Sequence, residues 1–155
     1  MKDQAEAFAV CLARGIVDPP VVGAWLDMEI GRSASPGIEL IEASLAARDR
    51  SRLIAALHQI PGDFDPGRVG GFIFAYLRRA PYPDVDQAIR VGLQLHMLAL
   101  TGLAPSPEAE IDMWSRDCDL ERARGAKEWR AIAEEMSRFI DQYAVPVLPD
   151  GRGDV

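Results

Sequence analysis

Apolar residues recur at helical spacing along most of the chain. The clearest row lies near the C-terminal end, opposite a polar face, and comprises Trp129, Ile132, Ala133, Met136, Phe139, Ile140 and Tyr143. This period predicts an amphipathic helix that begins near Ala126. Residues 84–101 are apolar almost all round, which predicts a helix at the centre of the fold. No alternating run is long enough to predict a strand.

Helix starts are marked by a capping residue followed directly by proline, at Asp18-Pro19, Ser35-Pro36, Asp65-Pro66 and Ser106-Pro107. The capping oxygen accepts a hydrogen bond from a free backbone N–H, and proline at the first helical position lacks an N–H that would have no partner there. Two further helices are predicted without this signal: one over residues 3–14 and one that starts near Arg48-Asp49. The third helix has Ile38, Ile41 and Leu45 as its apolar row.

These elements predict an all-α protein. Short loops join the helices, so consecutive helices are expected to be antiparallel neighbours in a single irregular bundle or short superhelical stack of about seven to eight helices. No repeat of fixed period is apparent, which favours the bundle. The predicted domain covers residues 1–144. The proline- and glycine-rich residues 145–155 are expected to form a flexible C-terminal tail.

Composition points to a soluble protein of the cytoplasm. The chain has 155 residues and 48% hydrophobic content, enough for one domain with its own core. Cys11 and Cys118 form no CxxC motif and are expected to be free thiols in a reducing compartment. The N-terminal residues lack the pattern of a signal peptide. The longest apolar stretch, residues 89–103, is interrupted by polar residues and is shorter than the ~20 residues of a membrane span.

Charge narrows the class of partner. The chain carries 24 acidic and 17 basic residues, for a net charge of −7, and has no basic stripe, which disfavours nucleic acid and anionic membranes. A basic protein partner fits better. The densest negative stretch is the predicted partner-binding site and comprises Glu108, Glu110, Asp112, Asp117, Asp119 and Glu121. A solvated helix end and loop would account for the same residues.

Chemistry-bearing motifs are scarce. His58 and His96 have no carboxylate or cysteine at metal-ligand spacing, so we expect neither a metal nor another cofactor. His58 is expected to interact with the last carbonyls of its own helix, and His96 to be a core residue. Gly67, Gly70 and Gly71 lack the remainder of a phosphate-binding loop and favour close helix packing. The sequence therefore predicts a protein that is not an enzyme.

Asp27 has an unusual setting, directly after Trp25 and Leu26 on the second helix. A carboxylate at the edge of an apolar face must be hydrogen-bonded, because burying it unpaired is costly. We expect Asp27, Glu42 and Ser44 to form a buried polar network. An enzymatic alternative would bring Asp27, Glu42 and His96 together in one pocket.

Two segments carry a resemblance to known proteins. Residues 21–27 (VVGAWLD) and 38–46 (IELIEASLA) resemble small helical bacterial proteins with V-x-x-W-A-D followed by I-E-L-S-L. Many of these look like immunity proteins of polymorphic or contact-dependent toxin systems, or are uncharacterised. The resemblance covers residues 10–60 and, more weakly, residues 117–120 and 139–143. Leu26 replaces the usual alanine, and Ala43 stands where a leucine is common.

The resemblance implies a non-enzymatic cytoplasmic protein that binds and neutralises a cognate toxin. A negative surface would steer a basic toxin domain by long-range attraction. An alternative is a helical adaptor or regulatory subunit of a bacterial assembly, which holds a peptide or helix in a groove. A helical protein with a small-ligand pocket is a further alternative. Oligomeric state is not determined by these patterns.

Overall fold

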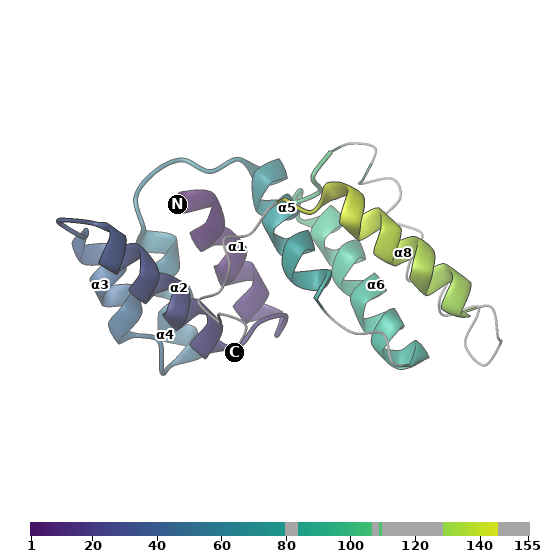
Figure 1. The fold of residues 1–155 in the computed structure, drawn as a ribbon, viewed down its shortest axis with the longest axis horizontal. Coiled ribbons are helices and arrows are strands. Elements are labelled where there is room, and N and C mark those ends of the chain that lie inside the picture. Colours follow the sequence, from purple (N-terminus) through teal and green to yellow (C-terminus); the bar gives the residue numbers. More distant parts are fainter. Residues whose placement is uncertain (80–83, 107–108, 110–128, 146–155) are drawn as a thin grey trace. The chain divides into compact units, whose positions relative to one another are not determined.

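The computed structural model describes residues 1–79, 84–106, 109 and 129–145 (Figure 1). Regular structure in these residues is entirely helical, with seven helices and no strand, which confirms the all-α class. The helices fall into two compact units that divide between Phe64 and Asp65. The expectation of one domain over residues 1–144 stays a prediction. The expected tail lies outside the described residues from position 146 onward.

The first unit contains four helices: α1 (Lys2–Ala13), α2 (Pro19–Arg32), α3 (Ile38–Leu45) and α4 (Arg50–Gln59). Helix α4 packs on both α1 and α3, and α3 also packs on α2 (Figure 1). The core holds Phe8 and Leu12 of α1 with Leu53 and Leu57 of α4, all fully or almost fully buried. Phe8 also contacts Trp25 of α2, with ring centroids 5.0 Å apart. One apolar stripe from each of these helices thus builds the core.

The second unit contains α5 (Pro66–Leu77), α6 (Val85–Leu100) and α8 (Trp129–Tyr143), with α8 packed on α5 and α6. Phe74 of α5 meets Phe139 of α8 at a centroid distance of 5.6 Å. The sequence predicts that α6 is apolar and central all round, and this is wrong for one side. One side of α6 is exposed to solvent, with exposed fractions of 46%, 42% and 53% for Leu93, Met97 and Leu100. Their spacing of four and three residues places these side chains on the same side of the helix.

The four predicted capping residues that precede proline differ in whether their side chains accept a capping hydrogen bond. Asp65 accepts a hydrogen bond from the Arg68 N–H at 3.1 Å, as predicted for the start of α5. Ser106 accepts from the Ala109 N–H at 3.1 Å, and the rest of the predicted seventh helix lies outside the described residues. Asp18 stands at the N-cap of α2, but its side chain makes no capping hydrogen bond.

The predicted start of α3 at Ser35-Pro36 is wrong. The helix begins two residues later, with Gly37 as its N-cap residue. The Ser35 N–H donates to the Ser33 hydroxyl at 3.3 Å, a local side-chain turn that competes with helix formation. Ser35 and Pro36 therefore belong to the loop between α2 and α3.

Two glycines of α5 allow backbone segments to approach the helix closely. A Cβ on Gly70 would overlap the Leu103 carbonyl oxygen, and one on Gly71 would fall 2.8 Å from a methyl carbon of Val145. The Val145 N–H also donates to the Gly71 carbonyl at 3.2 Å. Small residues are needed here, as predicted. The close neighbours are the segment that follows α6 and the end of α8, where the Tyr143 carbonyl oxygen would lie 3.3 Å from a Cβ on Gly71.

Candidate protein-binding surface

The predicted acidic binding site cannot be placed on the fold. Its six residues, Glu108, Glu110, Asp112, Asp117, Asp119 and Glu121, all lie outside the described part of the chain. The assignment of these residues to partner binding stays a prediction.

The expected Asp27 network is present in part, but it is not buried. The Ser44 hydroxyl donates to Asp27 Oδ1 at 3.1 Å, which joins α3 to α2. Asp27 is exposed and Ser44 half-buried, because the preceding residues Trp25 and Leu26 occupy the positions that face the core. Glu42 is exposed and lines a hollow that does not include Asp27. The prediction of a buried network is therefore wrong.

The enzymatic alternative gains no support from the first unit. Asp27 and Glu42 belong to this unit, and the hollow of about 340 Å³ that Glu42 lines is not lined by Asp27. His96 is half-buried on α6 of the second unit.

Among the described residues, no group of three or more His, Cys, Asp or Glu side chains is placed to hold a metal ion. Within the same residues, no helix combines the length and apolar character needed to cross a membrane.

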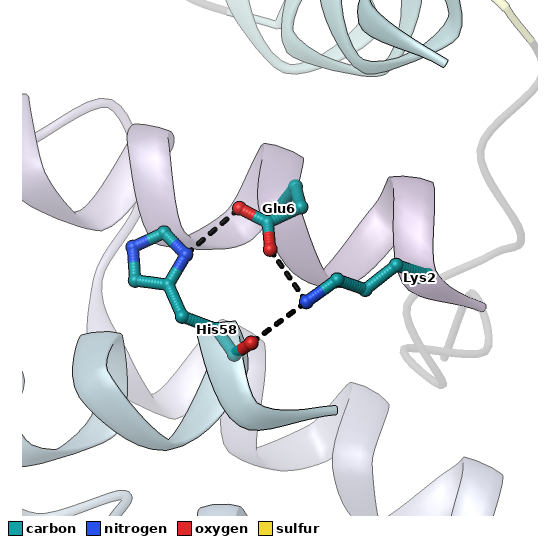
Figure 2. A network of polar contacts seen from close by, with 3 residues as sticks. All are labelled: Lys2, Glu6 and His58. Carbon is teal, nitrogen blue, oxygen red and sulfur yellow. Dashed lines mark hydrogen bonds and ion pairs between the residues drawn. The ribbon is translucent and has the colours of Figure 1, made fainter. Parts of the chain in front are cut away.

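A polar cluster joins the start of α1 to the end of α4 (Figure 2). The Glu6 carboxylate contacts Lys2 Nζ at 2.6 Å and His58 Nδ1 at 2.8 Å. Lys2 Nζ also donates to the His58 carbonyl at 2.8 Å. The sequence predicts that His58 interacts with the last carbonyls of its own helix. In the structure, its ring contacts Glu6 instead, and it is Lys2 that donates to a carbonyl at the end of α4. Both Glu6 oxygens, Lys2 Nζ and His58 Nδ1 are engaged, so this cluster fits a structural contact that holds α1 against α4.

An apolar row on α3 faces outward. Ile38, Ile41 and Leu45 are 60%, 36% and 80% exposed. Their spacing of three and four residues places them on one side of the helix. The buried side chains of α3 are instead Leu40 and Ala43. An exposed helix face is normally polar, so this apolar row is a candidate for contact with another chain.

A hollow of about 340 Å³ adjoins this row between α3 and α4. Its lining combines apolar side chains with one acid and one base: Glu42, Leu45, Ala46, Arg52 and Ala56. Leu45 belongs to both the row and the hollow. We call the row and the hollow together the α3 surface.

Sequence patterns alone missed this surface. The α3 segment has apolar residues on both sides, so periodicity could not show whether the row at positions 38, 41 and 45 or the pair at positions 40 and 43 faces the core. The available signal was the excess of apolar residues in an eight-residue helix. A helix of that length on the surface needs only one apolar stripe.

A second hollow in the first unit, of about 480 Å³, bears on the small-ligand alternative. Leu40 and Ile60 provide apolar lining, while Glu29, Arg32 and Glu39 provide charge. Arg32 and Glu29 already pair with one another at 3.3 Å. The charged groups thus include an internal pair, which gives no specific indication of a ligand.

Comparison with other proteins leaves the chain without an identified relative. Searches of protein-family models, curated proteins and solved structures found no match. The resemblance to immunity proteins therefore stays a prediction, and the α3 surface is the structural observation that bears most directly on function.

Proposed function

We propose that the chain acts by binding another protein chain through the α3 surface. The observation that carries this proposal is the exposed row Ile38, Ile41 and Leu45 on a helix that already buries Leu40 and Ala43. Removing apolar surface from water is favourable by roughly 25 cal/mol per Å², and the excess over the cost of association appears as affinity. Three adjacent branched side chains therefore provide a driving force for binding.

The size and charge of the α3 surface favour a short helix as the bound element. Helix α3 has eight residues and is therefore about 12 Å long, which matches two to three turns of a partner helix. The hollow beside it accepts one apolar side chain, in the manner of helix-in-groove recognition. Glu42 and Arg52 supply opposite charges at the hollow and would set the orientation of the partner.

Photocrosslinking in the cells that naturally make the protein tests this function. A benzophenone amino acid in place of Leu45 is expected to form a covalent adduct with a protein chain. The matched control carries the same amino acid in place of Phe64, an apolar side chain that is 46% exposed and lies outside the helices. No protein adduct at position 45, or equal adducts at both positions, would contradict the proposal.

Within this class, we propose that the cognate partner is a basic toxin domain. The net charge of −7 and the resemblance of residues 10–60 to immunity proteins support this assignment. Charge reversal at Glu110, Asp112 and Asp119 is then expected to lower both the association rate and the affinity for that partner. Unchanged binding would remove these acidic residues from the interface.

The α3 surface also favours the second candidate, a helical adaptor or regulatory subunit. An adaptor needs a groove for a helix, but it needs no acidic surface. The two candidates differ in their genomic setting, because an immunity gene lies beside a toxin gene and an adaptor gene need not. Identification of the protein crosslinked at position 45 distinguishes them directly.

A further inference from the structure

We propose that His58 is a modification site, whose Nε2 atom accepts a phosphoryl group from a phosphorylated partner protein. His58 lies in the last turn of α4, and its ring contacts Glu6 of α1. The inference goes beyond the proposed function, because it concerns a chemical reaction on α4 and does not depend on what binds the α3 surface.

The contact with Glu6 determines which nitrogen of the His58 ring can react. Nδ1 lies 2.8 Å from Glu6 Oε2, and an ionised carboxylate only accepts hydrogen bonds, so the neutral ring carries its proton on Nδ1. Nε2 then holds the free lone pair. Figure 2 shows this nitrogen on the side of the ring that points away from Glu6. In the part of the chain that the structure describes, no hydrogen bond or ion pair engages Nε2.

The ring of His58 is accessible, whereas the groups that position it are largely buried. The His58 side chain is 48% exposed, but those of Glu6 and Lys2 are only 12% and 11% exposed. Lys2 Nζ contacts the second Glu6 oxygen at 2.6 Å and also donates to the His58 carbonyl, which restricts the carboxylate. An imidazole whose second nitrogen is held by a carboxylate is the arrangement that orients a reactive histidine.

The charges of this cluster suit a phosphoryl group. Lys2 neutralises Glu6, so the cluster presents no net charge that would repel an incoming phosphate. Acyl transfer needs hydrogen-bond donors for an oxyanion, which an exposed ring on a helix surface does not itself supply. Phosphoryl transfer depends mainly on positioning and on cations around the phosphate, which the site of the donor protein can provide. A phosphoryl group is therefore favoured over an acyl group.

The transfer exchanges one bond to phosphorus for another. The Nε2 lone pair forms a bond to phosphorus, while the bond from phosphorus to the leaving group of the donor breaks and its electron pair departs with that group. Nδ1 keeps its proton, so the ring becomes positively charged and its hydrogen bond to Glu6 becomes charge-assisted. Because a phosphorylated imidazole is itself reactive, the donor must be a phosphoramidate or an acyl phosphate on the partner protein.

Reaction of the full chain with potassium phosphoramidate, a small donor whose leaving group is ammonia, tests this site. We expect one phosphoryl group per chain, an increase of about 80 Da in mass, which peptide mapping places on His58 and phosphorus NMR assigns to Nε2. His96, half-buried on α6, is the internal reference. The same reaction in urea provides the decisive comparison, because every histidine is exposed in the unfolded chain. We expect His58 to react at least tenfold faster in the folded chain than in urea.

Substitutions separate the role of the Glu6 charge from simple exposure of the ring. His58→Gln is expected to abolish the modification. Glu6→Gln keeps an acceptor for Nδ1 but removes the charge, so we expect the rate at His58 to fall at least tenfold, with an unchanged circular dichroism spectrum as the check of the fold. Glu134→Gln, which removes an exposed carboxylate from α8, is the matched control and is expected to react like the unsubstituted chain.

Three results would each overturn the proposal: no phosphoryl group on His58, a folded chain that reacts at His58 no faster than the unfolded chain, or an undiminished rate in Glu6→Gln. The comparison of folded and unfolded chain uses no substitution, so it decides the matter even where a variant fails to fold. None of these results bears on the crosslink at position 45, on which the proposed function depends.

Discussion

The carbonyl group of Leu103 lies against Gly70, where α5 meets the segment that follows α6. A Cβ on Gly70 would overlap the carbonyl oxygen and lie 3.0 Å from the carbonyl carbon. The obstructing atoms belong to the backbone, which cannot rotate away as a side chain can. The packing of the second unit therefore depends on the absence of a side chain at position 70.

Replacing Gly70 by alanine is expected to destabilise the protein by about 1–3 kcal/mol, the usual cost of overpacking a well-packed site. Urea unfolding of the variant measures this loss. Gly31→Ala is the control, because no atom lies within 4 Å of a Cβ at that position. That substitution is expected to be neutral or to stabilise the protein by up to about 1 kcal/mol through helix propensity. Similar results for both variants would contradict the close approach.

The contact of Glu6 with Lys2 and His58 is expected to stabilise the first unit measurably. The side chains of Lys2 and Glu6 are only 11% and 12% exposed. Glu6→Ala leaves the Lys2 ammonium without its carboxylate partner, so we expect a loss of about 1–3 kcal/mol in unfolding free energy. Arg50→Ala removes an ion pair to Asp18 between exposed side chains, and should cost no more than about 1 kcal/mol. A loss for Glu6→Ala no larger than that for Arg50→Ala would show that burial adds nothing.

Two aspartates at N-cap positions should differ in their contribution to stability. Asp65 accepts the Arg68 N–H at 3.1 Å, whereas Asp18 makes no capping hydrogen bond. Asp65→Ala is therefore expected to cost about 1 kcal/mol and Asp18→Ala clearly less. Thermal unfolding followed by circular dichroism compares the two variants. A larger loss for Asp18→Ala would contradict the capping geometry.

Burial of Cys11 should make stability fall at alkaline pH. Loss of solvation raises the pKa of the Cys11 thiol, and the charge of Arg14 opposes this increase. In the unfolded chain the thiol ionises near pH ~8.5, whereas the folded chain keeps its proton to higher pH. The contribution of the thiol to stability is therefore complete below about pH 8.5 and declines by about 1.4 kcal/mol per pH unit above it.

Cys11→Ala isolates this effect. The variant is less stable than the parent at neutral pH because it creates a small cavity, but it lacks the thiol that ionises on unfolding. The difference in unfolding free energy between the two proteins should therefore shrink as the pH rises from about 7 to about 10. A constant difference across this range would contradict the linkage.

Local signals predicted the helices better than they predicted the candidate site. The cap at Asp65 and the period of α8 depend on residues only three or four positions apart, so both could be recognised from the sequence. Ser35 and Pro36 lie in a loop because the Ser35 N–H donates to the Ser33 hydroxyl, a local hydrogen bond that competes with helix formation. At Asp27, the sequence indicated the contact with Ser44, but not that the carboxylate is exposed.

The sequence by itself determined that this protein is built from helices, and where most of them begin, because capping and helical periodicity act over a single turn. Only the tertiary structure decided which side of α3 faces the core and that Glu6 meets His58, a residue 52 positions away. Such contacts depend on how several helices pack together, and no local pattern contains that information. The exposed row Ile38, Ile41 and Leu45 follows from this packing, since Leu40 and Ala43 occupy the inward positions.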